Sequence, residues 1–401
     1  MHNYDVIIAG GGPAGASAAI HLAMRGTRVL LAEQKKFPRP KLCGEFISPE
    51  CAIHFQRLHV AEAMSAAHPA NLTATVFYSR SGKNVRVPSS WFGATGVALG
   101  LSRAEMDERL LRRASEAGAH VLEDAHATNV IFENQTASGI TIKQGTRETS
   151  YHAPITVDAT GRTRALTRRL GAHAKLARRE HGPMVAFKAH LENTAIEPGA
   201  CEIYFYRRGY GGLSSIENGL SNLCFIASAR DVRAFGANAD RVMREVVCEN
   251  QRAALTLAHA RANASWLAVS LAGFGRSSVA PVNGLLAIGD AASFIDPFTG
   301  SGMLMALESG ELAATAIAEF LSHSPDISSL DQLQTIYADR YRQTFNSRLT
   351  VSSLLRKAAF VPGLAETAIG FFGASDHLRR KLAQATRGSR PETSTAATRV
   401  R

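Results

Sequence analysis

Residues 10–15 of this 401-residue chain read GGGPAG, a G-x-G-x-x-G pattern that begins where an apolar segment ends. The apolar run Tyr4–Ala9 before the glycines predicts a buried parallel strand, and Ala14–Arg25 after them predicts a helix. The run Thr27–Ala32 predicts a second buried strand. The N-terminal segment therefore predicts a right-handed βαβ unit.

The spacing of these glycines indicates a dinucleotide site at the turn of the unit. Gly10 permits the tight turn, Gly12 lets the backbone approach a pyrophosphate, and Gly15 lets the helix pack on the strand. The start of the helix offers unpaired N–H groups and a positive dipole end to the phosphates. Glu33 ends the second strand, where its carboxylate can accept hydrogen bonds from the adenosine ribose.

Later segments favour FAD over NAD as the dinucleotide. The predicted strand Leu285–Gly289 leads into Asp290, whose carboxylate is suited to accept hydrogen bonds from a ribityl chain. The segment PFTGSG (297–302) opens a predicted helix over Ser301–Leu321. The positive end of that helix would stabilise the negative charge that a flavin ring gains on reduction. A DATGR segment (158–162) follows another predicted strand, Ile155–Ala159.

The fold class predicted for the whole chain is α/β with an α+β substrate region. Ser102–Ala117 predicts an amphipathic helix with Ser102 as its N-cap. Short strands prevail between about residues 184 and 271, interrupted by a predicted helix over Ala239–Leu257, and from about residue 328 the pattern is helical. We expect a Rossmann-like FAD-binding domain (1–75, 97–170 and 272–325), an inserted, mostly antiparallel substrate-binding sheet (76–96 and 171–271), a C-terminal helical segment (326–386) and a basic flexible tail (387–401).

The net charge of +11 divides between two local clusters. Arg162–Arg179 holds seven basic residues and no acidic one, and Ser375–Arg401 holds seven basic and two acidic residues. These segments carry +7 and +5, so the rest of the chain carries −1. No recognition motif or basic-aromatic platform accompanies the charge, so no nucleic acid partner is expected.

The cysteines and the hydropathy of the chain indicate the cellular compartment in which it works. The five cysteines form no Cys-x-x-Cys pair and lie near no histidine at metal-ligand spacing, so neither a disulfide framework nor a metal site is expected. The N-terminus lacks a basic signal region, and no apolar stretch approaches the roughly 20 residues of a spanning helix. We expect a cytoplasmic protein. The segment Val351–Phe372 mixes apolar with basic residues and is broken by Pro362 and Gly363. We expect it to pack on the protein's own domains, to cover a hydrophobic channel, or to contact an anionic membrane peripherally.

The order of these motifs resembles that of FAD-dependent oxidoreductases with the para-hydroxybenzoate-hydroxylase type of fold, and most closely the geranylgeranyl-reductase family. The marks are KLCGE (41–45), Arg103 with Asp107 in a helix, and GDAA (289–292) running into DPFTGSG (296–302). The resemblance covers residues 1–325 in order. It implies non-covalent FAD, with Arg103 reaching the cofactor and the substrate held above the isoalloxazine under a mostly antiparallel sheet.

Together with the glycine motif, the resemblance predicts the residues of the site. Cys43, in the loop that approaches the flavin, and Gly300, Ser301 and Gly302 are expected at the reacting centre, although free cysteines are more often small buried hydrophobes. The expected cofactor contacts are Gly10, Gly12, Pro13, Ala14, Gly15, Glu33, Gln34, Lys41, Cys43, Gly44, Arg103, Asp107, Gly161, Gly289, Asp290, Pro297, Gly300, Gly302 and Met303.

Three functions remain open at the level of sequence. The resemblance implies hydride transfer from reduced flavin to a C=C bond of a hydrophobic or phenolic small molecule. The Tyr-x-Trp-x-Phe-Pro segment of such reductases reads YGGLSS (210–215) here, which favours a more compact substrate and a monooxygenase that hydroxylates or epoxidises an aromatic, polyketide or isoprenoid molecule through a flavin hydroperoxide. A flavin-binding redox sensor is the third.

Two further features bear on the reaction. The Trp-x-Trp-x-Ile-Pro segment of flavin-dependent halogenases has no counterpart in the chain. The chain also holds no second G-x-G-x-x-G for a nicotinamide. NAD(P)H is therefore expected to bind transiently, or an electron-donor protein supplies the electrons.

Overall fold

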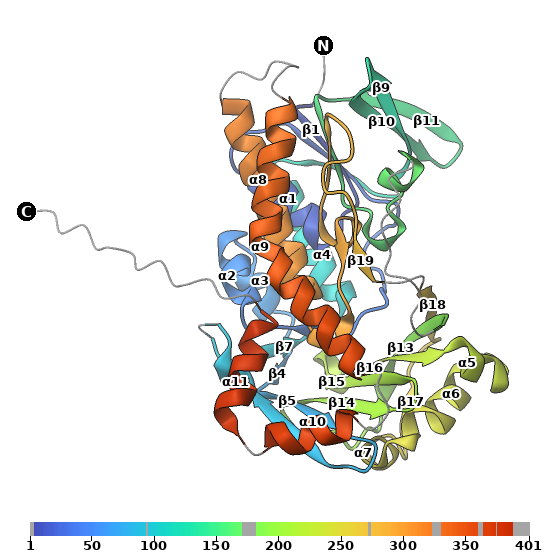
Figure 1. Cartoon of the computed structure of the whole chain (residues 1–401). Helices are drawn as coiled ribbons and strands as arrows, with labels where there is room; N and C mark the ends of the chain where they lie inside the picture. The colour runs from blue at the N-terminus through green and yellow to red at the C-terminus, as the bar shows by residue number, and fades with distance from the viewer. Residues whose placement is uncertain are drawn as a thin grey trace, which may run out of the picture.

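A five-stranded parallel sheet with the order β20-β12-β1-β2-β8 lies in the upper half of the computed structural model (Figure 1). Its strands are β1 (Val6–Ala9), β2 (Val29–Ala32), β8 (His120–Leu122), β12 (Ile155–Asp158) and β20 (Leu285–Ala287). Every residue of β1, β2, β12 and β20 is buried, as their continuous apolar runs predict. The four strands predicted from these runs are confirmed.

Alternate residues of the parallel sheet pack on two different layers. Ile8 and Leu31 share a core with three helices, whereas Ile7 and Leu30 share a core with a three-stranded antiparallel sheet. The helices are α1 (Pro13–Ala23), α4 (Arg103–Glu116) and α8 (Gly302–Ser322), and the strands are β9 (His126–Glu133), β10 (Thr136–Gln144) and β11 (Arg147–His152). Cover on both faces is what a parallel sheet requires.

Local sequence explains how the helices of this layer begin and pack. A Cβ at Gly310 of α8 would lie 2.5 Å from the carbonyl oxygen of Ala14, so glycine lets α8 and α1 approach closely. The predicted cap of α4 is confirmed, because the Ser102 hydroxyl accepts a hydrogen bond from the Glu105 N–H at 3.3 Å. The smaller elements of the chain's first 100 residues are α2 (Cys51–Arg57), α3 (Ala61–Ser65), β3 (Phe46–Ile47), β4 (Ala70–Leu72) and β7 (Ala98–Gly100), and β19 (Gly275–Arg276) pairs with β21 (Ser293–Phe294) later in the chain.

An eight-stranded sheet with the order β17-β13-β16-β15-β14-β5-β6, and with β18 also beside β13, forms the lower half (Figure 1). Its pairs are antiparallel except for β14 with β5. The strands are β5 (Ala74–Tyr78), β6 (Asn84–Pro88), β13 (Met184–Glu192), β14 (Ala200–Tyr206), β15 (Gly209–Ser215), β16 (Ser221–Ser228), β17 (Arg261–Ala262) and β18 (Leu267–Leu271). An α/β fold with a second, mostly antiparallel sheet is thus confirmed.

The single helix predicted over Ala239–Leu257 is wrong. The structure has α6 (Ala239–Glu245), the turn η5 (Val247–Glu249) and α7 (Gln251–Thr256), which cover one face of the eight-stranded sheet together with α5 (Ala229–Ala234). Asn250 makes the break because its backbone is extended. Its side chain caps α7 and donates to the carbonyl oxygens of Tyr78, Ser79 and Phe205 at 2.9–3.1 Å. Tertiary hydrogen bonds outweigh helical periodicity at this residue.

Three C-terminal helices join the two halves, namely α9 (Leu330–Ala359), α10 (Leu364–Gly373) and α11 (Asp376–Ala385). Helix α9 runs beside α8 down to the eight-stranded sheet, and α10 and α11 pack near β6 (Figure 1). The buried Tyr337 hydroxyl donates to the Ala287 carbonyl oxygen at 2.7 Å, which ties α9 to β20. Within the described part of the chain, no helix combines the length and apolarity needed to cross a membrane.

The structure describes residues 4–93, 95–170, 182–271, 274–322, 330–359, 364–373 and 375–387. Three predictions fall wholly or partly outside these ranges. They concern residues 171–179 of the first basic cluster, the break at Pro362 and Gly363, and the tail after Arg387.

Candidate active site

A cavity of about 720 Å³ lies between the carboxyl ends of the parallel strands and one face of the eight-stranded sheet. Ala9 and Ala32 line it from the ends of β1 and β2, and Thr75, Ile203 and Phe205 line it from the second sheet. Open α/β sheets bind ligands at the carboxyl ends of their strands. This cavity is therefore the candidate site.

The glycine loop opens toward the cavity at one position and is closely packed at two. A Cβ at Gly10, where φ is +110°, would lie 2.3 Å from the Ala159 carbonyl oxygen, and one at Gly15 would lie 1.8 Å from the Gly10 carbonyl oxygen. A Cβ at Gly12 would approach Arg103 at 3.9 Å and nothing nearer. Gly12, the N-cap residue of α1, thus leaves the first turn of the helix accessible to an anion.

Glu33 offers acceptors at the far end of the same loop. Its carboxylate is buried, and Oε2 accepts from the Gly11 N–H at 2.8 Å while Oε1 accepts from the Lys35 N–H at 3.0 Å. Each oxygen keeps a lone pair, and both Glu33 and the adjacent Gln34 line the cavity. The carboxylate oxygens of Glu33 and the amide of Gln34 therefore fit the hydroxyls of an adenosine ribose.

Asp290 lies among cations at the middle of the cavity. It belongs to the turn η6 (Gly289–Ala291), which packs against η2 (Gly161–Thr163). Burial raises the pKa of Asp290, although Arg103, Lys41 and Arg162 act in the opposite direction. Burial and the neighbouring arginines lower the pKa of Lys41. These groups fit a cofactor that brings both phosphates and hydroxyls.

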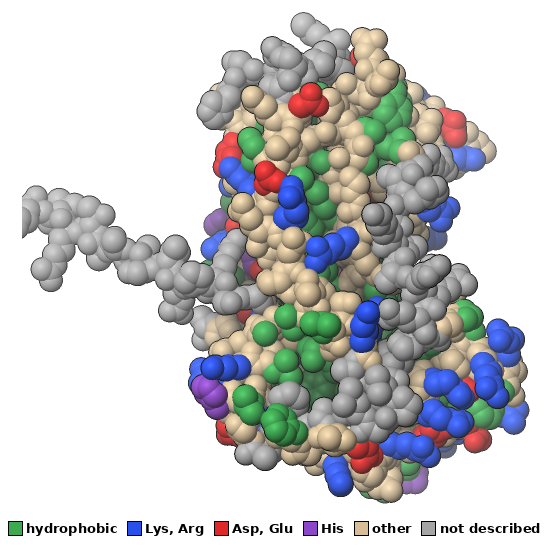
Figure 2. All heavy atoms as spheres, in the orientation of Figure 1, with side chains coloured by type: hydrophobic (Ala, Val, Ile, Leu, Met, Phe, Trp, Pro, Cys, Tyr) green, Lys and Arg blue, Asp and Glu red, His purple; other side chains and the backbone are tan. Residues whose placement is uncertain are grey.

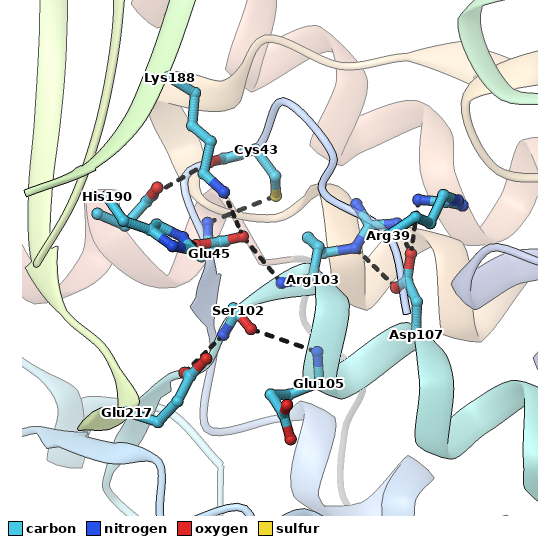
Figure 3. Close-up of polar contacts among 11 residues, drawn as sticks. Arg39, Cys43, Glu45, Ser102, Arg103, Glu105, Asp107, Lys188, His190 and Glu217 are labelled. Carbon is cyan, nitrogen blue, oxygen red and sulfur yellow. Dashed lines mark hydrogen bonds and ion pairs between the residues drawn. The ribbon is translucent and has the colours of Figure 1, made fainter. Parts of the chain in front are cut away.

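Arg103 is held in place by Asp107, as Figure 3 shows. Its Nε and Nη2 donate to the two carboxylate oxygens of Asp107 at 2.7 Å each, and Arg39 Nη1 lies 3.3 Å from one of them. Burial lowers the pKa of Arg103, but Asp107 and Cys43 raise it further, so the net shift is upward. Arg103 lines the cavity, and Asp107 lies behind it, fully buried.

A buried cluster that sequence reasoning missed fixes the loop that carries Cys43. Glu45, 1% exposed, adopts a left-handed backbone with φ of +53°. Its Oε1 accepts from the Arg103 N–H and from Lys188 Nζ at 2.8 Å each, and its Oε2 lies 2.7 Å from His190 Nε2 (Figure 3). Burial raises the pKa of Glu45, but His190 and Lys188 lower it more. The cluster joins the loop to α4 and β13.

A second contact sets the position of Cys43 itself. Asn222 Nδ2 on β16 donates to the Cys43 carbonyl oxygen at 3.1 Å. Cys43 lines the cavity, as does Cys224, two residues after Asn222. The sequence signal for the cluster was weak because Lys188, His190 and Asn222 stand alone in strands far from residues 41–45.

The start of α8 faces the cavity through its glycines. Gly300, with φ of +61°, Gly302 and Met303 line the cavity, so the positive end of the helix dipole points into it. The Ser301 side chain is turned away and fully buried, with its hydroxyl within hydrogen-bonding distance of the carbonyl oxygens of Thr299 (3.4 Å) and Thr386 (3.3 Å), to either of which it can donate its one proton. The loop therefore approaches a ligand with backbone rather than with the serine hydroxyl.

Aromatic rings line the cavity where this loop meets the second sheet. Phe77, Phe205 and Tyr210 surround Phe298, with ring centroids 5.7, 5.5 and 5.5 Å from it. All four residues line the cavity. They come from β5, β14, β15 and the turn η7 (Pro297–Thr299), so no contiguous sequence motif marks them. The sequence signal available for this wall is the spacing of two between Cys201, Ile203 and Phe205, alternate residues of one strand that all line the cavity.

The structure brings most of the predicted residues to one cavity. The predicted residues that line it are Gly10, Gly12, Pro13, Ala14, Glu33, Gln34, Lys41, Cys43, Gly44, Arg103, Gly161, Gly289, Asp290, Gly300, Gly302 and Met303. Gly15, Asp107 and Ser301 support the lining residues from behind. Pro297 begins η7. Lining residues absent from the prediction include Arg162 and, from the C-terminal helices, Leu355, Ile369, Arg379 and Arg387.

The chain is similar to proteins of known activity or structure over most of its length. The chain is 28% identical over 361 residues to a digeranylgeranylglycerophospholipid reductase of Methanosarcina acetivorans, covering 88% of this chain and 84% of the relative. The solved flavin-dependent brominase Bmp2 superposes with a TM-score of 0.81 at 22% identity, covering 96% and 93% of the two chains. A geranylgeranyl bacteriochlorophyll reductase-like protein from Thermoplasma acidophilum has a TM-score of 0.77 at 20% identity, covering 94% and 92%.

The two solved structures share the fold with this chain. The model of the FAD binding domain family matches residues 3–346, a range that includes the glycine loop, Arg103, both large sheets and α8. Because this match spans most of the chain and the residues of the cavity fit FAD, the chain belongs to the FAD binding domain family and is an FAD-dependent oxidoreductase.

Proposed function

We propose that this protein reduces a C=C bond in a hydrophobic, isoprenoid-like small molecule at the expense of reduced FAD. The observation that carries the proposal is the apolar, aromatic wall that Phe77, Phe205 and Tyr210 of the second sheet form with Phe298 of the loop before α8. Such a wall holds an apolar chain and excludes water. The similarity to a digeranylgeranylglycerophospholipid reductase over most of both chains supports the same substrate class.

The residues divide the work of binding and orientation. The start of α1 and Arg103 take the pyrophosphate, Glu33 takes the adenosine ribose, and Asp290 takes the ribityl hydroxyls. Bound FAD supplies hydride when reduced. The start of α8, which lines the cavity, would stabilise the negative charge that the cofactor gains on reduction. The loop around Cys43 closes the cavity from the side of the second sheet.

The electron donor and a membrane partner belong to the same proposal. NAD(P)H binding transiently, or a donor protein, reduces the cofactor. Leu354, Phe371 and Leu378 on α9, α10 and α11 are 61%, 61% and 41% exposed, while Leu355, Ile369 and Leu382 of the same helices line the cavity. Peripheral contact with a lipid surface would bring an apolar substrate to the helices that line the cavity.

A monooxygenase is the second candidate, since Phe298 and the three rings around it also suit a flat aromatic substrate. One experiment separates the two. Reduced holoenzyme is mixed with geranylgeranyl lipid without oxygen, and flavin absorbance is followed. Reoxidation of the flavin with formation of the saturated lipid is expected. Reoxidation that needs oxygen, with incorporation of an oxygen atom into a phenolic compound, would overturn the reductase.

A further inference from the structure

The apolar wall of the cavity contains one hydrogen-bonded pair of titratable groups, a phenol and a carboxyl group. Tyr210 and Asp296 are 6% and 3% exposed, and the phenol donates a hydrogen bond to Asp296 Oδ1. Tyr210 lines the cavity from β15, while Asp296 lies in the segment between β21 and η7. The Phe298 ring packs edge-on against Tyr210 at 5.5 Å and 76°, so the phenol is held in one orientation.

The surroundings of Asp296 favour its neutral form. Oδ1 also accepts from the Phe298 N–H at 3.0 Å, and Oδ2 is buried without a hydrogen bond. The titratable and charged groups that face Asp296 among the described residues are Tyr210 on β15 and Arg356 on α9, whose Nε lies 3.8 Å from Oδ2. Burial raises the pKa of Asp296 more than these contacts lower it.

The proposed reduction needs a proton as well as a hydride. The wall formed by the second sheet presents the protic side chains of Thr75, Cys201, Tyr210 and Cys224 to the cavity. Burial raises the pKa of Cys201 to about 12 and also raises the pKa values of Cys224 and Tyr210, so their pKa shifts do not separate these groups. The geometry separates them, because the Tyr210 oxygen is hydrogen-bonded directly to Asp296, a second acid that can replace a donated proton.

We propose, resting on the function proposed above, that Tyr210 is the general acid of the reduction and that Asp296 resupplies its proton. With Asp296 protonated on Oδ1, the carboxyl donates to the phenol oxygen, and the phenol proton turns into the cavity. The π bond of the substrate breaks as one carbon receives hydride from the reduced cofactor and the other receives the Tyr210 proton. The Asp296 proton passes to Tyr210, and the carboxylate regains a proton from water between turnovers.

The test uses reduced holoenzyme and geranylgeranyl lipid without oxygen. Tyr210→Phe is expected to slow flavin reoxidation by about 100-fold, the lower range for loss of a general acid. The wild-type rate falls as pH rises through the pKa of Asp296, because the neutral carboxyl is the donor. Asp296→Asn removes this fall and lowers the rate.

Tyr204→Phe is the matched control. Tyr204 is buried on the neighbouring strand and donates to Glu202 Oε2 at 2.6 Å, on the face of the sheet that packs against the helices. Its removal should leave the pH profile unchanged. An infrared C=O stretch of a neutral carboxyl, shifted in Tyr210→Phe and absent in Asp296→Asn, checks the pair independently of turnover.

The outcomes separate this inference from the proposed function. If Tyr210→Phe is reoxidised as fast as the wild type, the relay is wrong and the reductase stands. If the wild type itself is not reoxidised by an isoprenoid lipid, the proposed function fails first. The absence of a neutral-carboxyl band that depends on Asp296 would overturn the relay in either case.

Discussion

Gly12 and Gly15 occupy the same motif but are needed for different physical reasons. A Cβ at Gly15 would overlap the Gly10 carbonyl oxygen at 1.8 Å, inside the protein, whereas a Cβ at Gly12 would enter the cavity. One glycine therefore serves packing between strand and helix, and the other serves the approach of a ligand. The motif by itself does not show which glycine is needed for packing and which is needed for binding.

Substitution by alanine should separate them. Gly12→Ala is expected to weaken FAD binding at least ~10-fold, because the methyl group takes the space of a phosphate, with little change in the stability of the protein without FAD. Gly15→Ala should lower the free energy of unfolding by about 2–3 kcal/mol through overpacking. Flavin fluorescence titration and urea unfolding measure the two effects. Equal losses of stability in both variants would contradict this assignment.

Asn250 shows how one side chain decides the division of an element. It caps α7 and donates to the carbonyl oxygens of Tyr78, Ser79 and Phe205, so it joins α7 to β5 and β14. Asn238 caps α6 through a single bond to the Arg241 N–H on the exposed surface. The two residues have the same cap chemistry and differ in tertiary bonding.

This difference predicts unequal costs for the same substitution. Asn250→Ala should lower the free energy of unfolding by about 3 kcal/mol, because buried carbonyl oxygens lose their donors. Asn238→Ala, the matched control, should cost about 1 kcal/mol, the ordinary value of a cap. Urea unfolding at neutral pH measures both. Similar values for the two variants would show that the tertiary bonds of Asn250 add nothing.

A polar contact between α2 and α8 gives the fold a dependence on pH. The Glu311 carboxylate of α8 lies 2.9 Å from His54 Nδ1 and 2.9 Å from Arg57 Nη1 of α2. Burial raises the pKa of Glu311, but the neighbouring His54 and Arg57 lower it to about 2. Because the folded value lies below the unfolded value of about 4.5, the stabilisation is complete above pH 4.5 and is lost as pH falls toward 2.

Glu311→Gln should therefore be destabilised most at neutral pH. We expect a difference in unfolding free energy from the wild type of about 2–3 kcal/mol at pH 7. That difference should shrink steadily between pH 4.5 and pH 3. Urea unfolding of both proteins over this range measures it. A difference that stays constant with pH would exclude ionisation of Glu311 as its source.

At the scale of the whole molecule, the C-terminal helices carry apolar side chains on two sides. Figure 2 shows hydrophobic side chains gathered around a hollow at the lower end of α9, beside α10 and α11. Leu354, Phe371 and Leu378 are exposed on these three helices, and the exposed Arg380 and Lys381 follow on α11. The predicted alternatives for this stretch, packing inward and contact with a lipid surface, involve different faces of the same helices.

Vesicle binding tests the outward face. The protein should sediment with phosphatidylglycerol vesicles, and serine at Leu354, Phe371 and Leu378 together should weaken binding about 10-fold or more by removing apolar area. Leu255→Ser is the matched control, since Leu255 is 69% exposed on α7 in the lower half. Equal binding by the triple variant and the control would contradict a membrane role for this face.

The sequence by itself determined the parallel sheet, the glycine loop and the cofactor class, because these depend on contiguous signals such as apolar runs, glycine spacing and an acid at a strand end. It also located the charge in two clusters. Only the tertiary structure decided the substrate wall, the Glu45 cluster and the Tyr210–Asp296 pair, because their members are single residues on strands and loops far apart in the chain. Sheet register and the packing of α9–α11 bring these residues together, so the residues show no periodicity or fixed spacing in the sequence.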